Sequence, residues 1–263
     1  SVIIGMEDTG HYHFALLKYL LDLQYTVALI NPKTTDFNRK MQGGITKNDK
    51  LDTINICDVL DTPERKKQYR ITKVNKFDLY EQKQLTRQHH NLKEELNVYK
   101  NRLQKSIDIV FPEFNTLFNN EYTITYLNIL RKYSDAYTIA HTDIRSLRKC
   151  FKYCNSFSAE ELKELASNSV GIHDVSISFI IQSVISSIDL INSQIEELDK
   201  KIEELAITQA SSITSIPGIS IITGTSILAE LGDISKYSNA GKLIKFAGVN
   251  PYISESGEFS ADK

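Results

Sequence analysis

The sequence has few cysteines, little net charge and only short apolar runs. Its three cysteines (Cys57, Cys150, Cys154) are odd in number and widely spaced, which argues against a disulfide framework and favours a reducing, cytoplasmic compartment. A net charge of -2 argues against a general nucleic-acid binder. Apolar runs such as Val2–Met6 are far shorter than the roughly 20 residues of a bilayer-spanning helix, so no membrane segment is expected.

The small net charge hides a strong local asymmetry. Residues 63–105, here called the basic arm, contain twelve Lys and Arg against five Asp and Glu. A local excess of this size predicts contact with a polyanion such as nucleic acid. A solvated helix face would explain the same lysines equally well. The candidate phosphate contacts are Arg65, Lys66, Lys67, Arg70, Lys73 and Lys76.

The first part of the chain has the pattern of an α/β unit. Val2–Met6 and Val27–Ile30 are short apolar runs with β-branched residues, which is typical of buried strands. Between them, apolar residues recur at helical spacing from Phe14 to Leu21. A strand–helix–strand unit of this kind is nearly always parallel and right-handed. A further helix is expected to end before Pro63.

Long helices are expected in the middle of the chain. The stretch from Glu64 to Val110 has no glycine or proline and sparse apolar residues, which predicts a long, mostly solvated helix pair. Further on, apolar residues alternate by four and three over four heptads, which predicts a coiled coil or long helical hairpin and makes self-association into a homo-oligomer plausible. These residues are Ile177, Ile181, Val184, Ile188, Ile191, Ile195, Leu198, Ile202 and Leu205.

Three carboxylates are candidates for a metal site. Glu7 follows a predicted strand, where open α/β sheets place their ligands. Asp49 and Asp52 are three residues apart and project from one face of a helix. Such hard oxygen ligands suit Mg²⁺, and two ions would support phosphoryl transfer. Alternatively, the two aspartates are solvated and Glu7 caps the next helix.

The order of several short motifs resembles a known family. Residues 7–13 (EDTGHYH), 30–32 (INP) and 46–52 (TKNDKLD) are similar to the RuvC-like DEDD domain of insertion-sequence transposases of the one-ten family. Further motifs of that family follow in order, including residues 110–114 (VFPEF), 217–219 (PGI) and 246–248 (FAG). The resemblance therefore extends over almost the whole chain.

The resemblance implies a DNA recombinase that holds Mg²⁺ in its RuvC-like part and attacks DNA with a serine. Glu7, Asp49 and Asp52 match three of the family's four acidic residues, and the fourth is expected upstream of Ser1. The family serine, which precedes a glycine, falls on Ser256, while Ser254 is a weaker candidate because Glu255 follows it. The resemblance also implies a structured guide RNA held by the basic arm. Truncation at both ends is expected.

These observations predict an α/β plus mostly α protein. The expected division is a partial RuvC/RNase H-like domain (1–62), a basic helical region (63–170), a coiled-coil helix (171–208) and a small helical C-terminal transposase domain (209–263). Within the last part, Pro217–Gly218 resembles a helix-hairpin-helix element, or is a plain tight connection. Two rival functions stay open: a RuvC-like junction nuclease that uses water, and an inactive nucleic-acid-binding scaffold.

Overall fold

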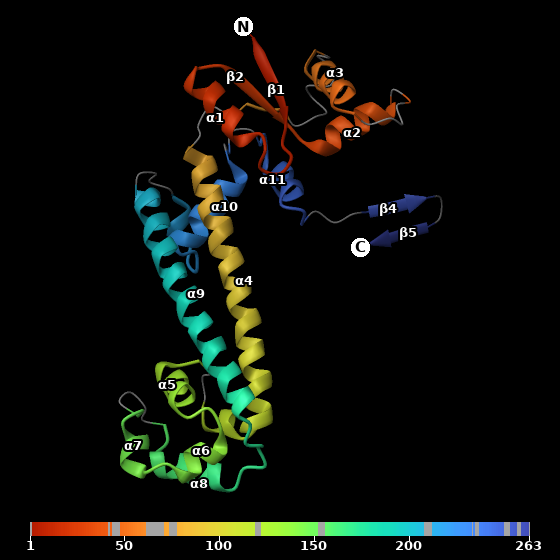
Figure 1. The fold of residues 1–263 in the computed structure, drawn as a ribbon. Coiled ribbons are helices and arrows are strands. Elements are labelled where there is room, and N and C mark those ends of the chain that lie inside the picture. The colour runs from red at the N-terminus through yellow and green to blue at the C-terminus, as the bar shows by residue number, and fades with distance from the viewer. Residues whose placement is uncertain are drawn as a thin grey trace. The chain divides into compact units, whose positions relative to one another are not determined.

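The protein forms two compact units, Ser1–Lys83 and Gln84–Lys263. Their helices and strands are labelled in Figure 1, a computed structural model. The structure describes residues 2–41, 43, 48–61, 71–73, 78–118, 122–151, 156–207, 212–232, 234, 237–249, 253–256 and 259–262.

A small mixed sheet organises the first unit (Figure 1). β1 (Ile3–Glu7) pairs in parallel with β2 (Thr26–Ile30), and β3 (Ile71–Lys73) pairs with β2 in the antiparallel direction. α1 (Phe14–Asp22) connects β1 to β2. The predicted strand–helix–strand unit with parallel strands is therefore confirmed.

The core of the first unit lies on this sheet. Met6, Leu17, Val27 and Leu29 form its buried cluster. Phe14 packs at its margin, edge-on to Tyr80, with ring centroids 5.6 Å apart. Apolar side chains of β1, β2 and α1 thus supply the burial that fixes the parallel pair.

Two further helices follow β2. α2 (Pro32–Met41) begins directly after the strand, and α3 (Asp49–Asp61) packs against β1. The approach of α3 is close because β1 carries a glycine at its centre. A Cβ at Gly5 would lie 2.6 Å from Leu60 Cδ1 and 2.7 Å from Ile56 Cγ2. Glycine at this position therefore lets α3 pack directly on the strand that ends in Glu7.

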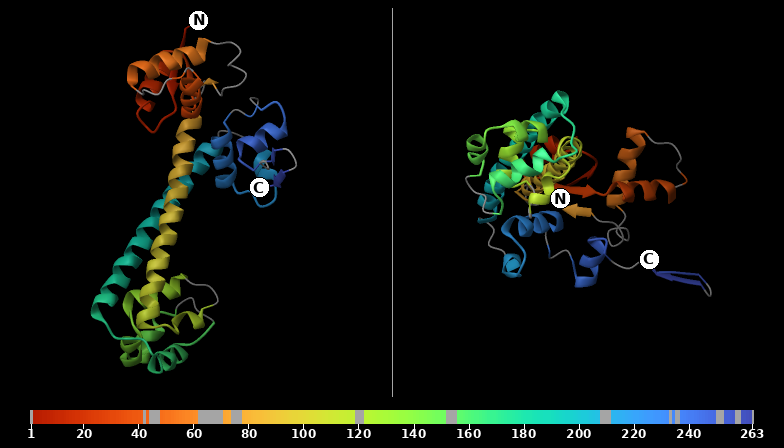
Figure 2. Two further views of the ribbon diagram at one scale, coloured as in Figure 1. Left: turned by 90° about the vertical axis from the view of Figure 1, so that its right-hand side faces the viewer. Right: turned by 90° about the horizontal axis from the view of Figure 1, so that it is seen from below.

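Two long helices run side by side in the second unit (Figures 1 and 2). They are α4 (Asp78–Val110), which begins in the first unit, and α9 (Val175–Ile207). Their apolar faces belong to one buried cluster, which includes Leu92, Leu96, Leu103 and Ile107 of α4 and Ile181, Ile185, Ile188 and Ile195 of α9. The predicted continuous helix over Ile177–Leu205 is confirmed, and α4 of the same chain covers its isoleucine face. Pairing with a second copy stays a prediction.

The predicted helix pair from Glu64 to Val110 is wrong in its first part. β3 lies within that range, and the helix begins only at Asp78. Ile71 and Thr72 are β-branched and pair with the free edge of β2. This pairing favours a strand there, although the local sequence has no glycine or proline to break a helix. Residues 62–70 and 74–77 lie outside the described residues.

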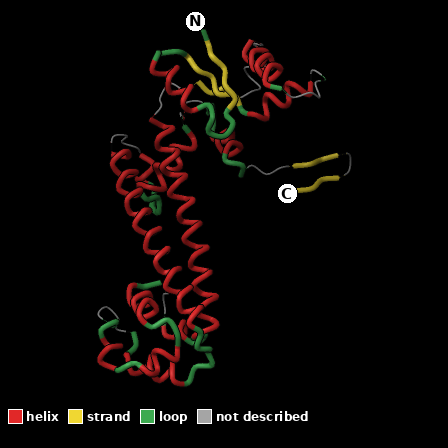
Figure 3. Tube along the Cα trace, viewed as in Figure 1, coloured by secondary structure: helices red, strands yellow, loops and turns green. Residues whose placement is uncertain are grey.

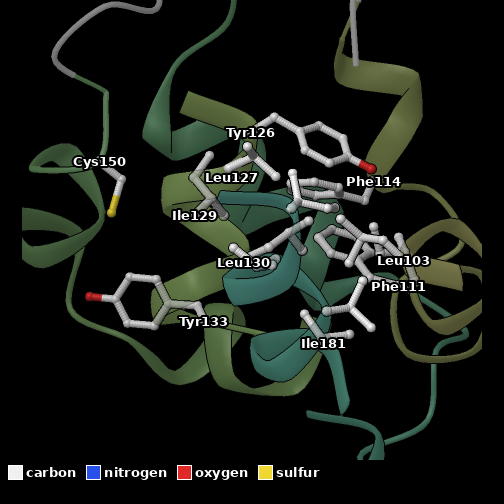
Figure 4. Close-up of a cluster of buried hydrophobic side chains, with 14 of the residues drawn as sticks. Leu103, Phe111, Phe114, Tyr126, Leu127, Ile129, Leu130, Tyr133, Cys150 and Ile181 are labelled. Atoms are coloured by element: carbon white, nitrogen blue, oxygen red, sulfur yellow. The ribbon is translucent and has the colours of Figure 1, made fainter. Parts of the chain in front are cut away.

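Short helices lie between α4 and α9 in the sequence. They are α5 (Ile124–Lys132), α6 (Ala136–His141), α7 (Ile144–Arg148) and α8 (Ala159–Ser167). Each begins at a residue whose side chain accepts a hydrogen bond from the first turn: Thr123, Asp135, Asp143 and Ser158. Figure 4 shows their core, in which Phe111, Phe114 and Tyr126 pack with Leu130 and Ile181.

The last part of the chain is built from small elements. α10 (Ile221–Leu231) packs against α9, and α11 (Ala240–Phe246) follows it. The antiparallel hairpin of β4 (Ile253–Ser256) and β5 (Phe259–Asp262) comes last, as the strand colouring of Figure 3 shows.

By length and composition, Val175–Ala206 is the one described helix apolar enough to cross a membrane. Ile181, Ile185, Ile188, Ile191 and Ile195 of this helix lie in the buried cluster of the second unit, whereas Phe179, Ile180 and Leu190 are exposed. Asp189, near its middle, also pairs with Arg131, with 2.6 Å between Oδ2 and Nη2.

Candidate functional site

The ends of three elements of the first unit carry the polar side chains of the candidate site. β1 ends at Glu7, and α2 begins at Pro32, where a missing N–H costs the helix nothing. α3 begins at Asp49, and the preceding Asn48 caps it by accepting from Leu51 N at 2.9 Å. Local sequence therefore sets where each element starts or stops.

The carboxylate of Glu7 is held from α2. The Thr35 hydroxyl donates to Glu7 Oε1 and lies 2.9 Å from the carbonyl oxygen of Pro32. Thr35 is itself buried. The side chain at the end of β1 is thus tied to the first turn of the neighbouring helix.

Asp52, in the first turn of α3, faces a cation from α2. Arg39 Nη1 lies 3.6 Å from Asp52 Oδ1, while Nη2 of the same guanidinium bonds to Asp36. Lys40 Nζ also pairs with Asp36 Oδ2 at 2.7 Å. The hydrogen bond from Lys40, aided by the Arg39 charge, holds the pKa of Asp36 below its ordinary value, so this carboxyl stays ionised.

These side chains line one pocket of about 290 Å³. Its walls are Glu7, Thr9, Pro32, Lys33, Thr35, Asp36, Arg39 and Asp52. Two of the three predicted metal ligands, Glu7 and Asp52, therefore meet at one pocket although 45 residues separate them in the sequence. Asp49 is exposed one turn earlier on α3 and is not part of the pocket wall.

A buried amide pair fixes the spacing of the two helices that supply this wall. Asn38 of α2 donates to the side-chain oxygen of Asn55 on α3. Asn55 in turn donates to the carbonyl oxygen of Thr35, with 2.6 Å between nitrogen and oxygen. Both asparagines are buried. Because Thr35 also holds Glu7, this network connects the Glu7 carboxylate to α3, the helix that carries Asp52.

The donors of the pocket fit a hard divalent cation. Carboxylate oxygens of Glu7 and Asp52, with the Thr35 hydroxyl nearby, are the ligand type that Mg²⁺ prefers. Among the described residues, no three His, Cys, Asp or Glu side chains lie close enough to share one ion. An ion at this pocket would therefore take two protein carboxylates and complete its shell with water or phosphate oxygens.

The predicted nucleophile lies in the last hairpin. Ser256 is the final residue of β4 and is paired with Phe259 of β5. Ser254, the weaker candidate, is two residues earlier on the same strand and is paired with Ala261.

Most of the predicted phosphate contacts of the basic arm lie outside the described residues. These are Arg65, Lys66, Lys67, Arg70 and Lys76. Lys73 is described in its backbone alone, in β3, where it pairs with Ala28 of β2.

The Pro217–Gly218 segment connects a single 3-10 turn, Ser212–Ser215, to α10. Gly218 has φ of 89°, a conformation that favours glycine, and Ser220 caps α10 by accepting from Thr223 N at 3.1 Å. This geometry is a tight connection into a capped helix. A single turn precedes it in the described residues in place of a full helix.

The sequence analysis did not identify several residues that build or line the site, among them Thr35, Asp36, Asn38, Arg39 and Asn55. Arg39 follows Asp36 by three residues, which is a helical pairing distance, and this signal could have found that pair. The Asn38–Asn55 and Thr35–Glu7 contacts join different elements and leave no mark in local spacing.

Comparison with known proteins gives consistent matches to the two ends of the chain. A transposase family model, of the DEDD type of IS110 elements, matches residues 1–112. A second model, described as the transposase IS116/IS110/IS902 family, matches residues 210–263. The insertion element IS116 uncharacterized 44.8 kDa protein of Streptomyces clavuligerus is 35% identical over 69 residues, which are 26% of this chain. The matched part spans 17% of that relative's length.

Proposed function

The chain belongs to the IS116/IS110/IS902 family of transposases, and from this membership we propose that it cuts and rejoins DNA strands in transposition. The observation that carries the proposal is the convergence of Glu7 and Asp52 on one pocket. The pocket lies inside the segment that the DEDD transposase model matches. Carboxylates are the side chains that hold Mg²⁺ where it assists phosphoryl transfer.

The proposed ion is Mg²⁺, and Glu7 and Asp52 would bind it from the pocket wall. Asp49, the third predicted ligand, lies one turn earlier on α3, outside that wall, and would not bind the same ion in this arrangement. When bound, the ion would supply positive charge to the oxygens of a DNA phosphate. Thr35 orients Glu7, and the amide pair of Asn38 and Asn55 keeps α2 and α3 at fixed spacing.

The nucleophile is assigned to Ser256. Its Oγ would form a bond to phosphorus as one P–O bond of the DNA backbone breaks. The serine hydroxyl would lose its proton in this step, and the oxygen of the freed DNA end would gain one. The phosphoserine link keeps the energy of the broken bond, so a hydroxyl end of a second strand can reverse the step and complete strand exchange. The match of residues 210–263 to the second transposase model supports this assignment.

The partners proposed are DNA, a structured guide RNA and a second copy of the chain. The charge excess of residues 63–105 supports a nucleic-acid contact, through Arg65, Lys66, Lys67, Arg70, Lys73 and Lys76. The exposed Phe179 and Leu190 leave apolar surface on α9 beyond the face that α4 covers. A cytoplasmic location is also proposed, because the two cysteines that the structure describes, Cys57 and Cys150, are free thiols.

Strand cleavage by a panel of variants tests the proposal. With a labelled DNA carrying the junction of the protein's own element, Glu7→Gln, Asp52→Asn and Ser256→Ala should each abolish strand exchange. Asp61→Asn at the end of α3 and Ser254→Ala on β4 are matched controls that should keep it.

The same panel separates the rivals. Full cleavage by Ser256→Ala with free 5′ and 3′ ends would assign the attack to water and the protein to the junction nucleases. Absence of cleavage by the unaltered protein, with DNA still bound, would make it a binding scaffold.

A further inference from the structure

Positive charge already faces the carboxylates of the pocket. Among the described residues that line it, Glu7, Asp36 and Asp52 are acidic and Lys33 and Arg39 are basic. Mg²⁺ in proteins is held by one or two carboxylates together with water and phosphate oxygens. A cation held by Glu7 and Asp52 would therefore be repelled by the basic side chains beside them, and it would bind more tightly if this positive charge moved away.

Arg39 is the residue placed to do so. Its guanidinium uses one nitrogen, Nη2, for Asp36 and the other, Nη1, for Asp52. The side chain is 20% exposed, so water screens these contacts less than it would at the surface. Arg39 thus bridges one carboxylate of its own helix and one carboxylate of α3.

The two contacts differ in strength. The bond to Asp36 is a close, charge-assisted hydrogen bond between neighbours on α2. The contact to Asp52 is 3.6 Å from nitrogen to oxygen, beyond hydrogen-bond length. Asp52 can therefore release the guanidinium without breaking a hydrogen bond, and Arg39 keeps Asp36 as a partner.

We propose that Arg39 is an internal counter-cation that neutralises Asp52 while the pocket is metal-free and withdraws onto Asp36 when a divalent cation takes Asp52. This inference rests on the metal role proposed above for Glu7 and Asp52. It makes Arg39 and Asp36 positioning residues that set the metal affinity of the pocket, since a guanidinium beside Asp52 competes with a dication by charge repulsion.

The proposal predicts opposite effects for the two residues. Arg39→Gln removes the competing charge, so Mg²⁺ and Mn²⁺ should bind about five- to tenfold more tightly by isothermal titration calorimetry at low salt. The metal-free protein should melt at a lower temperature, because Asp36 and Asp52 then lose the guanidinium that contacts both of them. Asp36→Asn should weaken metal binding, because Arg39 loses its close partner and turns fully to Asp52.

A double variant separates this route from a general charge effect. If Asp36 acts through Arg39, Asp36→Asn should change metal affinity by less than twofold once Arg39→Gln is present. Lys40→Gln is the matched control: it removes an adjacent charge that pairs with Asp36 but does not line the pocket, and it should leave metal affinity within about twofold of the parent value.

The outcomes are distinguishable. Unchanged or weaker metal binding by Arg39→Gln would overturn the proposal, as would equal effects of Asp36→Asn in both backgrounds. Loss of DNA binding by Arg39→Gln with unchanged metal affinity would make Arg39 a phosphate contact and would also overturn it. Metal binding that survives Asp52→Asn would instead refute the metal site of the proposed function.

Discussion

The network around Asn55 gives the most detailed test of how the pocket is built. Asn55→Ala removes two hydrogen bonds from a buried setting, one from the Asn38 amide and one to the carbonyl oxygen of Thr35. Each group so deprived costs about 1–2 kcal/mol when it cannot reach water, so the first unit should lose about 2–4 kcal/mol. Because Thr35 also holds Glu7, the affinity for Mg²⁺ should fall as well.

Hydrogen exchange measured by mass spectrometry can assign this loss to the first unit. Amides of α2 and α3 should exchange faster in Asn55→Ala, and those of α9 should not change. Thr53→Ala is the matched control on the same helix, because Thr53 is exposed and bonds only to the preceding turn, at Asp49 O. A change below 0.5 kcal/mol for Asn55→Ala would refute the view that this network fixes the spacing of α2 and α3.

Three further predictions concern the second unit. Gly171→Ala would place a Cβ 2.2 Å from the carbonyl oxygen of Val110, a backbone clash that no rotamer relieves, so thermal melting should fall by about 5 °C or more. Burial lowers the pKa of His89, so the unfolded state binds the proton more tightly than the folded state. The free energy of unfolding should therefore fall as the pH drops below about 6.5. His89→Gln should reduce this pH dependence in urea titrations at pH 5 to 7. Ile188 is 1% exposed, so Ile188→Asp would bury a charge between α4 and α9 and should reduce the helical signal in circular dichroism. Leu190 is 59% exposed, so Leu190→Asp should change stability little.

Local patterns in the sequence predicted the elements that carry the site. Periodicity predicted an apolar strand that ends at Glu7 and a helix that presents Asp49 and Asp52 on one face, and the family resemblance implied a metal role for all three. Glu7 and Asp52 line one pocket, whereas Asp49 does not. The isoleucine heptads predicted α9 by periodicity as well.

What escaped prediction depends on contacts between elements. β3 forms because β2 offers a free edge to Ile71 and Thr72, and nothing in the surrounding basic residues indicates that edge. The heptad pattern of α9 did not identify its partner, since α4 and a second copy would bury the same face, and the structure pairs it with α4. The contacts of Arg39 with Asp52 and of Asn55 with Asn38 form only when α2 and α3 pack against each other. Arginine and asparagine are common on helix surfaces, so their presence in the sequence did not predict these contacts.

The proposed function requires that a serine of this chain become covalently attached to DNA when the strand breaks. The most direct measurement is mass spectrometry of protease digests after incubation with DNA of its own element and Mg²⁺. We expect a nucleotide-bearing peptide whose modified residue is Ser256, present with Ser254→Ala and absent with Ser256→Ala or Asp52→Asn. DNA cleaved to completion with no protein-linked nucleotide at Ser256 would contradict it.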